Sequence, residues 1–171
     1  MKIAITDACI FIDLHDLKLT NNLFSLKLDI HTSLDVFNEL YSHQQDILLA
    51  FHSVGKLTIH NISAEDRINI QKKNYPKALS ETDKTVLFLA GKIDAIVLSS
   101  DKVVRAYAKK KSIEYHGMLW IFDKLVETSL LDLSTAITKL ETLIKTNIIY
   151  QNNAELIKEM DRRLKVWKAH L

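Results

Sequence analysis

Short apolar segments of strand length alternate with segments of helical periodicity along most of this chain. Residues 2–6 (KIAIT) alternate in polarity and predict a strand, whereas residues 95–98 (AIVL) form a continuous apolar run. Such a run is expected of a strand that is covered on both faces, as in parallel sheets. Further strands are predicted at 57–60, at 113–115 and at 26–31, the last as a short edge strand or a connector. Since helical segments separate these strands, the sequence predicts an α/β fold with a parallel central sheet.

The helical segments account for most of the remaining chain. Three glycines and one proline in 171 residues leave few positions for the tight turns of an all-β protein. Periodicity and capping residues predict helices at about 8–19, 32–41, 42–55, 63–73, 80–91, 101–111, 118–128, 134–146 and 153–169. The length fits one domain of ~100–200 residues with a terminal extension. We therefore expect a main domain over residues 1–147 and a C-terminal amphipathic helix within residues 148–171.

That C-terminal segment has one apolar stripe. Leu156, Ile157, Met160, Leu164 and Trp167 recur at helical spacing, with basic residues on the other side. The stripe either packs on its own domain or forms a contact with a second copy or a partner protein, and the sequence leaves both interpretations open.

Composition excludes several classes of protein. A single cysteine, Cys9, cannot form an internal disulfide, and its apolar surroundings predict a core role and not a nucleophile. No apolar run reaches the ~18 residues of a membrane span, and no signal peptide is recognised. We therefore expect a cytoplasmic protein with no membrane contact. The formal net charge of +2 does not by itself predict binding to nucleic acid.

Acidic residues follow two of the predicted strands. Asp7 comes directly after residues 2–6, and Asp101 ends the segment that begins with the 95–98 run. In open α/β sheets, ligands bind beyond the carboxyl ends of the strands, which makes this pair a candidate site. Each aspartate could instead simply cap the next helix, because aspartate is a favoured N-cap residue.

A third acid lies on an apolar helix face. Asp83 shares one stripe with Leu79, Val86, Leu87 and Ala90, so its carboxylate points toward the interior or a cleft. Burial would require a hydrogen-bond donor or a cation. The alternative is a capping box with Ser80 as N-cap, and the two roles can coexist. Periodicity alone places Glu39 on the solvated side of its helix.

In this order and spacing, the motifs resemble the PIN-domain family and, within it, the VapC-like bacterial branch. The resemblance covers about residues 1–130 and rests on an acid after the first strand, a glutamate in a helix, an acid near the start of a later helix and an acid after the next strand. In this sequence they are ITDACI at 5–10, VFNEL at 36–40, LSETD at 79–83 and IVLSSD at 96–101. The chain departs from the family at Ala8, where threonine or serine often follows the first acid.

The resemblance implies an α/β/α sandwich and a metal-dependent ribonuclease acting on single-stranded RNA. Asp7 and Asp101 would be the principal ligands of Mg²⁺ or Mn²⁺, with Asp83 a ligand directly or through water. Glu39 would hold a metal-bound water or a second ion. Oxygen ligands of this kind favour these hard cations over zinc. The resemblance also implies a homodimer and a small antitoxin protein as partner.

Other residues and other protein classes offer alternatives to this interpretation. Lys102 and Arg105 could contact phosphate, although a solvated helix face explains them as well, and the same holds for residues 109–111. His116 could line the cleft or lie on the surface. A haloacid-dehalogenase-type phosphatase needs an acid where Cys9 stands, and Asp101 with Lys102 only mimics a receiver domain. A catalytically silent PIN-like binding or scaffolding module is the second hypothesis.

Overall fold

Five parallel strands form the centre of the protein, as the alternating pattern predicted. The computed structural model describes residues 1–171. Its strands are β1 (Lys2–Thr6), β2 (Leu28–Ser33), β3 (Leu57–His60), β4 (Ile96–Leu98) and β5 (Tyr115–His116). They form one sheet in the order β3-β2-β1-β4-β5, and every neighbouring pair is parallel.

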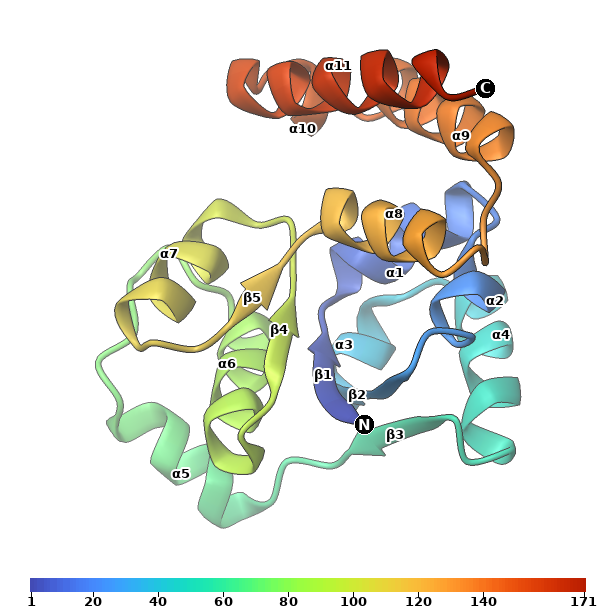
Figure 1. The fold of residues 1–171 in the computed structure, drawn as a ribbon. Helices are drawn as coiled ribbons and strands as arrows, with labels where there is room; N and C mark the ends of the chain where they lie inside the picture. The colour runs from blue at the N-terminus through green and yellow to red at the C-terminus, as the bar shows by residue number, and fades with distance from the viewer.

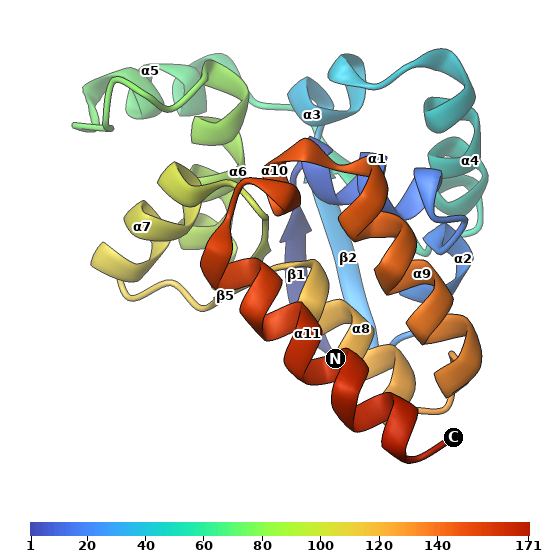
Figure 2. The same cartoon turned by 90° about the horizontal axis from the view of Figure 1, so that it is seen from above.

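Helices make up the layers around this sheet (Figures 1 and 2). They are α1 (Ala8–Asp16), α2 (Thr20–Leu23), α3 (Leu34–Glu39), α4 (Ser42–Ser53), α5 (Ala64–Lys72), α6 (Glu81–Ile93), α7 (Lys102–Lys110), α8 (Met118–Glu127), α9 (Leu133–Thr146), α10 (Ile148–Gln151) and α11 (Ala154–Ala169). The short helices α2 and α10 were not predicted. One continuous apolar core joins these layers to the sheet.

The strand predicted within residues 26–31 is present, but the prediction that it lies at an edge of the sheet, or is only a connector, was wrong. β2 spans six residues inside the sheet, where Ile30 pairs with Ala4 of β1 and with Leu57 of β3. Its second half is buried yet polar, which made the sequence look like an edge. Internal hydrogen bonds satisfy these groups: Thr32 Oγ1 donates to the carbonyl of Thr6 at 2.7 Å. Buried polar groups are tolerated in a sheet when they are paired in this way.

Helix α6 covers the central strands on one face. It packs against β1, β2 and β4 through the buried Val86, Leu87 and Ala90. All four apolar residues of the stripe predicted from periodicity, Leu79 included, are core residues, while Asp83 on the same stripe is half-buried.

The C-terminal helices form a further layer, with α8 and α1 between them and the sheet (Figure 1). The ring of Trp167 in α11 lies 6.3 Å from that of Phe122 in α8. Arg163 of the same helix donates to Asp123 at 2.8 Å. These contacts join α11 to the body of the protein. None of the helices is both long and apolar enough to cross a membrane.

Candidate metal site at the carboxyl edge of the sheet

The strand order reverses between β1 and β4. After β1 the chain builds β2 and β3 on one side, then crosses to β4 and β5 on the other. At such a switch point the connections leave in opposite directions, which opens a crevice where α/β proteins bind ligands. Asp7 follows β1 at this point, and its N–H donates to the carbonyl of Leu98, the last residue of β4, at 3.2 Å.

Asp7 is a buried carboxylate, only 4% exposed. It caps α1: its Oδ1 accepts the N–H of Ile10 at 3.1 Å and the thiol of Cys9 at 2.9 Å. Burial raises the pKa of Asp7 to about 6, and the negative charge of Asp83 adds to the rise, while hydrogen bonds from Cys9, Ser99 and Ile10 oppose it. The ionised form of this side chain is therefore short of compensating positive charge.

Asp101 caps the helix on the other side of the switch point. Its Oδ1 accepts the N–H groups of Val103 and Val104 at 2.8 and 2.9 Å. Its own N–H donates to Ser99 Oγ at 3.1 Å, and the side chain is exposed. Its Oδ2 makes no hydrogen bond within the chain, so one oxygen of Asp101 is free for a ligand.

Asp83 forms the capping box that the sequence left open. Its N–H donates to Ser80 Oγ and its Oδ2 accepts the N–H of Ser80, both at 3.1 Å. Its negative charge contributes to the raised pKa of Asp7. Capping uses one oxygen and leaves Oδ1 uncommitted, so the two roles predicted for Asp83 are compatible.

Glu39 is not brought into contact with the other three acids. It is the last residue of α3, it is exposed, and it forms no hydrogen bond or ion pair through its side chain. The expectation from periodicity that Glu39 is solvated is thus met in this structure.

The acids at this edge share one electrostatic feature. None of Asp7, Asp83, Asp101 or Glu39 forms an ion pair, although lysine and arginine pair with acids elsewhere on the chain, as Arg67 does with Asp35. No three side chains of the types that bind metals lie close enough together to form a closed ligand cluster. The free oxygens of Asp83 and Asp101, together with the carboxylate of Asp7 and water, are the atoms that could hold a hard cation.

Thr6 adds an unpaired polar atom next to this edge. Its Oγ1 is the one buried side-chain oxygen or nitrogen of the chain without a hydrogen-bond partner, and the residue directly precedes Asp7. Buried polar atoms are seldom left unpaired, and the exceptions often lie at functional sites.

The two basic residues predicted to contact phosphate lie on α7. Lys102 is exposed and lines a cavity of about 430 Å³ together with Cys9 and Asp101. Arg105 is half-buried: its guanidinium carbon lies 5.2 Å from the centre of the Tyr115 ring, and it forms no ion pair. Both cations are therefore free of acidic partners.

Cys9 is a structural residue at the same edge. It donates to Asp7, and its sulfur accepts the N–H of Ser100 at 3.4 Å. Burial and the neighbouring Asp7 carboxylate raise the pKa of the thiol. A thiol held in its protonated form is a poor nucleophile, in line with the role expected from its apolar surroundings.

Sequence reasoning missed a second buried acid behind this edge. The carboxylate of Asp13 in α1 accepts hydrogen bonds from Asn147 Nδ2 at 2.9 Å and from the Tyr150 hydroxyl at 3.0 Å. That hydroxyl also lies 2.9 Å from Ser100 Oγ, so α10 connects α1 to the segment before Asp101. Helical spacing gives a signal for Asp13, because it adjoins the buried Ile10–Leu14 face of α1. Nothing local in the sequence links it to Tyr150.

The fold and this edge define a parallel α/β domain with carboxylates at its switch point. The family model described as DUF3368, PIN domain, matches residues 3–165. The chain therefore belongs to the PIN domain family, whose members are generally nucleases that use divalent metal ions. The fold class and the family expected from the sequence are thus confirmed.

Among the solved structures that match the chain are two archaeal proteins. A PilT N-terminus domain protein from Sulfolobus solfataricus P2 is 12% identical, with a TM-score of 0.47 over 73% of this chain and 94% of that one. A domain of a functionally unknown protein from Methanocaldococcus jannaschii DSM 2661 is 19% identical, with a TM-score of 0.46 over 69% of this chain and 91% of that one. No curated protein matches the chain.

Proposed function

We propose that this chain is a metal-dependent endoribonuclease that hydrolyses phosphodiester bonds of single-stranded RNA. The observation that carries the proposal is the set of acids at the switch point between β1 and β4, none of which is neutralised by a lysine or arginine. A buried carboxylate without a cation, such as Asp7, is costly unless a ligand supplies the charge. Membership of the PIN domain family supports a nuclease.

The chemistry of the side chains fits Mg²⁺ or Mn²⁺. Mg²⁺ is usually held by one or two carboxylates and keeps several waters, so a closed cluster of three ligands is not required. In this proposal Asp7 and Asp101 would hold the ion directly, and Asp83 would do so directly or through water. Glu39 would hold a metal-bound water or a second ion. A bound divalent ion supplies charge neutralisation at the phosphate and lowers the pKa of a bound water.

The remaining residues of the site act on the RNA and on the carboxylates. Lys102 and Arg105 lie on the helix that Asp101 caps and have no acidic partner, which suits contact with the RNA backbone. Ser99 and Cys9 hold Asp101 and Asp7 in place through the hydrogen bonds described above. No nucleophile from the protein is needed.

The finer assignment is to the VapC-like bacterial branch, in which the chain would be the toxin of a toxin–antitoxin pair. In this proposal the protein acts in the cytoplasm as a homodimer and is neutralised by a small antitoxin. We assign the nuclease to residues 1–147, and residues 148–171 to a C-terminal helix that packs on this domain or contacts a partner. Expression of the chain is then expected to stop growth, and a short open reading frame is expected beside the gene.

The activity is tested with purified protein and a labelled single-stranded RNA, with Mg²⁺, with Mn²⁺ or with excess EDTA. Asp7→Asn and Asp101→Asn should lower cleavage by at least ~100-fold, the upper end of the loss caused by removing even an indirect partner of a metal. Asp132→Asn is the matched control, because Asp132 caps α9 in the way that Asp101 caps α7 but lies outside this edge. Calorimetric titration with Mn²⁺ in the absence of RNA should show the same ranking of variants.

A catalytically silent PIN-like binding module is the second candidate. Two observations favour it: the acids form no closed cluster, and Glu39 is exposed without a partner. If it is correct, RNA is not cleaved under any metal condition and neither Asp7→Asn nor Asp101→Asn alters binding to a partner. Cleavage that persists in excess EDTA would contradict the metal requirement instead.

A further inference from the structure

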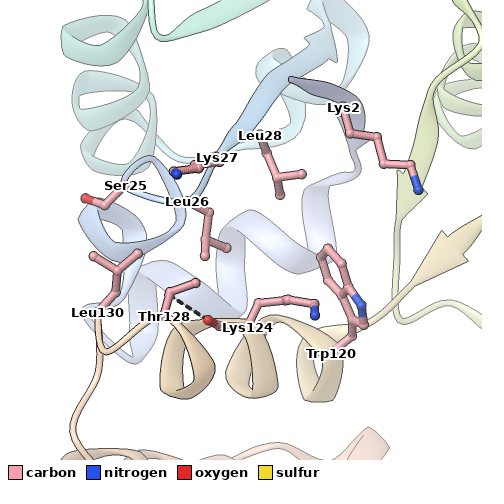
Figure 3. A pocket seen from close by; sticks show the side chains of 9 residues that line it. All are labelled: Lys2, Ser25, Leu26, Lys27, Leu28, Trp120, Lys124, Thr128 and Leu130. Carbon is pink, nitrogen blue, oxygen red and sulfur yellow. Dashed lines mark hydrogen bonds between the residues drawn. The ribbon is translucent and has the colours of Figure 1, made fainter.

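A groove of about 490 Å³ lies at the opposite end of the sheet from the candidate metal site. Its walls come from the start of β1, the segment before β2 and the helix α8 (Figure 3). Lys2 at its rim is five residues before Asp7 in β1, which at ~3.3 Å per residue puts the groove about 16 Å from that carboxylate. We call it the amino-edge groove.

The floor of the amino-edge groove is apolar and its rim is basic. Leu26, Leu28, Leu130 and the ring of Trp120 supply the apolar surface, and Leu26 is only 8% exposed. Three lysines from β1, the loop before β2 and α8 (Lys2, Lys27 and Lys124) surround this surface, and no acidic residue lines the groove (Figure 3). A ligand that matches it must combine apolar groups with negative charge.

The lysines are available to such a ligand. Lys27 is exposed and forms no ion pair. Lys2 pairs with Glu114, and Lys124 pairs with Glu127 at 2.7 Å, but the two lysine side chains are 54% and 39% exposed. Exposed pairs of this kind contribute little to stability, so incoming carboxylates can replace them.

The contacts of the Trp120 ring bear on whether the groove binds a peptide or a single-stranded nucleic acid. Its ring is stacked on His116, with centroids 4.2 Å apart and planes at 11°, and the ammonium of Lys124 lies 5.8 Å from its centroid. Proteins that bind single-stranded nucleic acid stack bases on aromatic faces. Since this ring is already occupied by His116 and Lys124, the groove suits aliphatic side chains better than bases.

The spread of the positive charges also favours a peptide. The three lysines stand on different sides of the groove, which suits a segment with several acidic residues (Figure 3). We propose that the amino-edge groove binds an acidic, amphipathic peptide segment of a partner protein. Apolar side chains of that segment lie on Leu26, Leu28 and Leu130, and flanking carboxylates meet Lys2, Lys27 and Lys124. This inference does not depend on nuclease activity.

The test uses the full chain and a short fluorescein-labelled peptide with a central leucine pair flanked by glutamates. Fluorescence anisotropy should show saturable binding that weakens with added salt, and the indole N–H signal of Trp120 should shift in NMR spectra. The signal of Trp167, which is a buried residue of α11, should stay in place. Replacing the peptide's leucines by serine, or its glutamates by lysine, should each abolish binding.

Charge reversal identifies the surface. The double variant Lys27→Glu, Lys124→Glu should bind the peptide at least ~10-fold more weakly, because rim charges set the strength and salt dependence of such contacts. The matched control Lys77→Glu, Lys158→Glu makes the same change of net charge at exposed lysines outside the groove and should bind as the wild type does. Equal binding by both double variants, no saturable binding, or displacement of the peptide by single-stranded RNA in EDTA would overturn the proposal.

Discussion

The buried carboxylate of Asp13 should make the stability of this protein fall as the pH rises through the weakly acidic range. Asp13 is 7% exposed. Burial raises its pKa from the ordinary value of 3.8 to about 6, although hydrogen bonds from Tyr150 and Asn147 act in the other direction. At neutral pH the folded protein therefore holds a negative charge that its surroundings only partly stabilise.

The size of the effect follows from proton linkage. A rise of the pKa from 3.8 to about 6 corresponds to about 3 kcal/mol. Since the folded state holds the proton more tightly than the unfolded state, this contribution is fully present below the unfolded pKa. It is lost as the pH rises through the folded pKa, so the change falls between about pH 4 and about pH 7.

The variant Asp13→Asn isolates the pH-dependent contribution of this carboxyl group to stability. An amide does not ionise, and its oxygen and nitrogen can still pair with Asn147 and Tyr150. The free energy of unfolding should be measured by urea denaturation, followed by circular dichroism, across this pH range. The free energy of unfolding of the variant, relative to that of the wild type, should rise by about 3 kcal/mol as the pH increases from about 4 to about 7.

The control for this series is Asp46→Asn, the same substitution at an exposed aspartate without a side-chain partner. The difference between that variant and the wild type should stay constant over the whole range. A constant difference for Asp13→Asn as well would refute the reasoning, because it would show that the carboxyl group titrates alike in the folded and unfolded states.

Three further outcomes are expected. Asp101→Ala should lower the free energy of unfolding by about 1 kcal/mol through loss of the helix cap, whereas Asp101→Asn should leave it nearly unchanged; urea denaturation of both separates capping from chemistry. Gly117→Ala would place a Cβ atom 2.5 Å from Arg105 Nη1, so the guanidinium must move; stability should change by less than ~1 kcal/mol, while RNA affinity, measured by anisotropy in EDTA, should fall. Phe122→Ala removes a fully buried ring and should cost about 3–5 kcal/mol in thermal or urea unfolding.

The positions of most strands and of the main helices along the sequence could be predicted, because they depend on local patterns. The apolar run at β4 and the alternation at β1 each identify a strand without knowledge of the rest of the chain. β2 could not be placed correctly, because the polar side chains of its buried half are satisfied by groups distant in sequence, such as the carbonyl of Thr6. The four-residue helices α2 and α10 are too short to show a helical period.

The candidate site could be predicted only in part, because local sequence patterns mark some of its residues and not others. Asp7 and Asp101 are marked by their positions after strands, and the capping box of Asp83 is a local motif. That Asp7 is buried with a raised pKa, whereas Glu39 is exposed, depends on how distant elements pack. Metal binding by these residues stays a prediction.

The hydroxyl of Tyr150 has a consequence for how this protein can be shortened. It bridges Asp13 in α1 and Ser100 after β4, so the two halves of the sheet are joined through a residue near the end of the chain. A truncation that ends at Asn147 would remove this bridge and expose the acid behind the switch point to solvent. Shortened forms used for crystallisation or assays should therefore retain α10, even where α11 is removed.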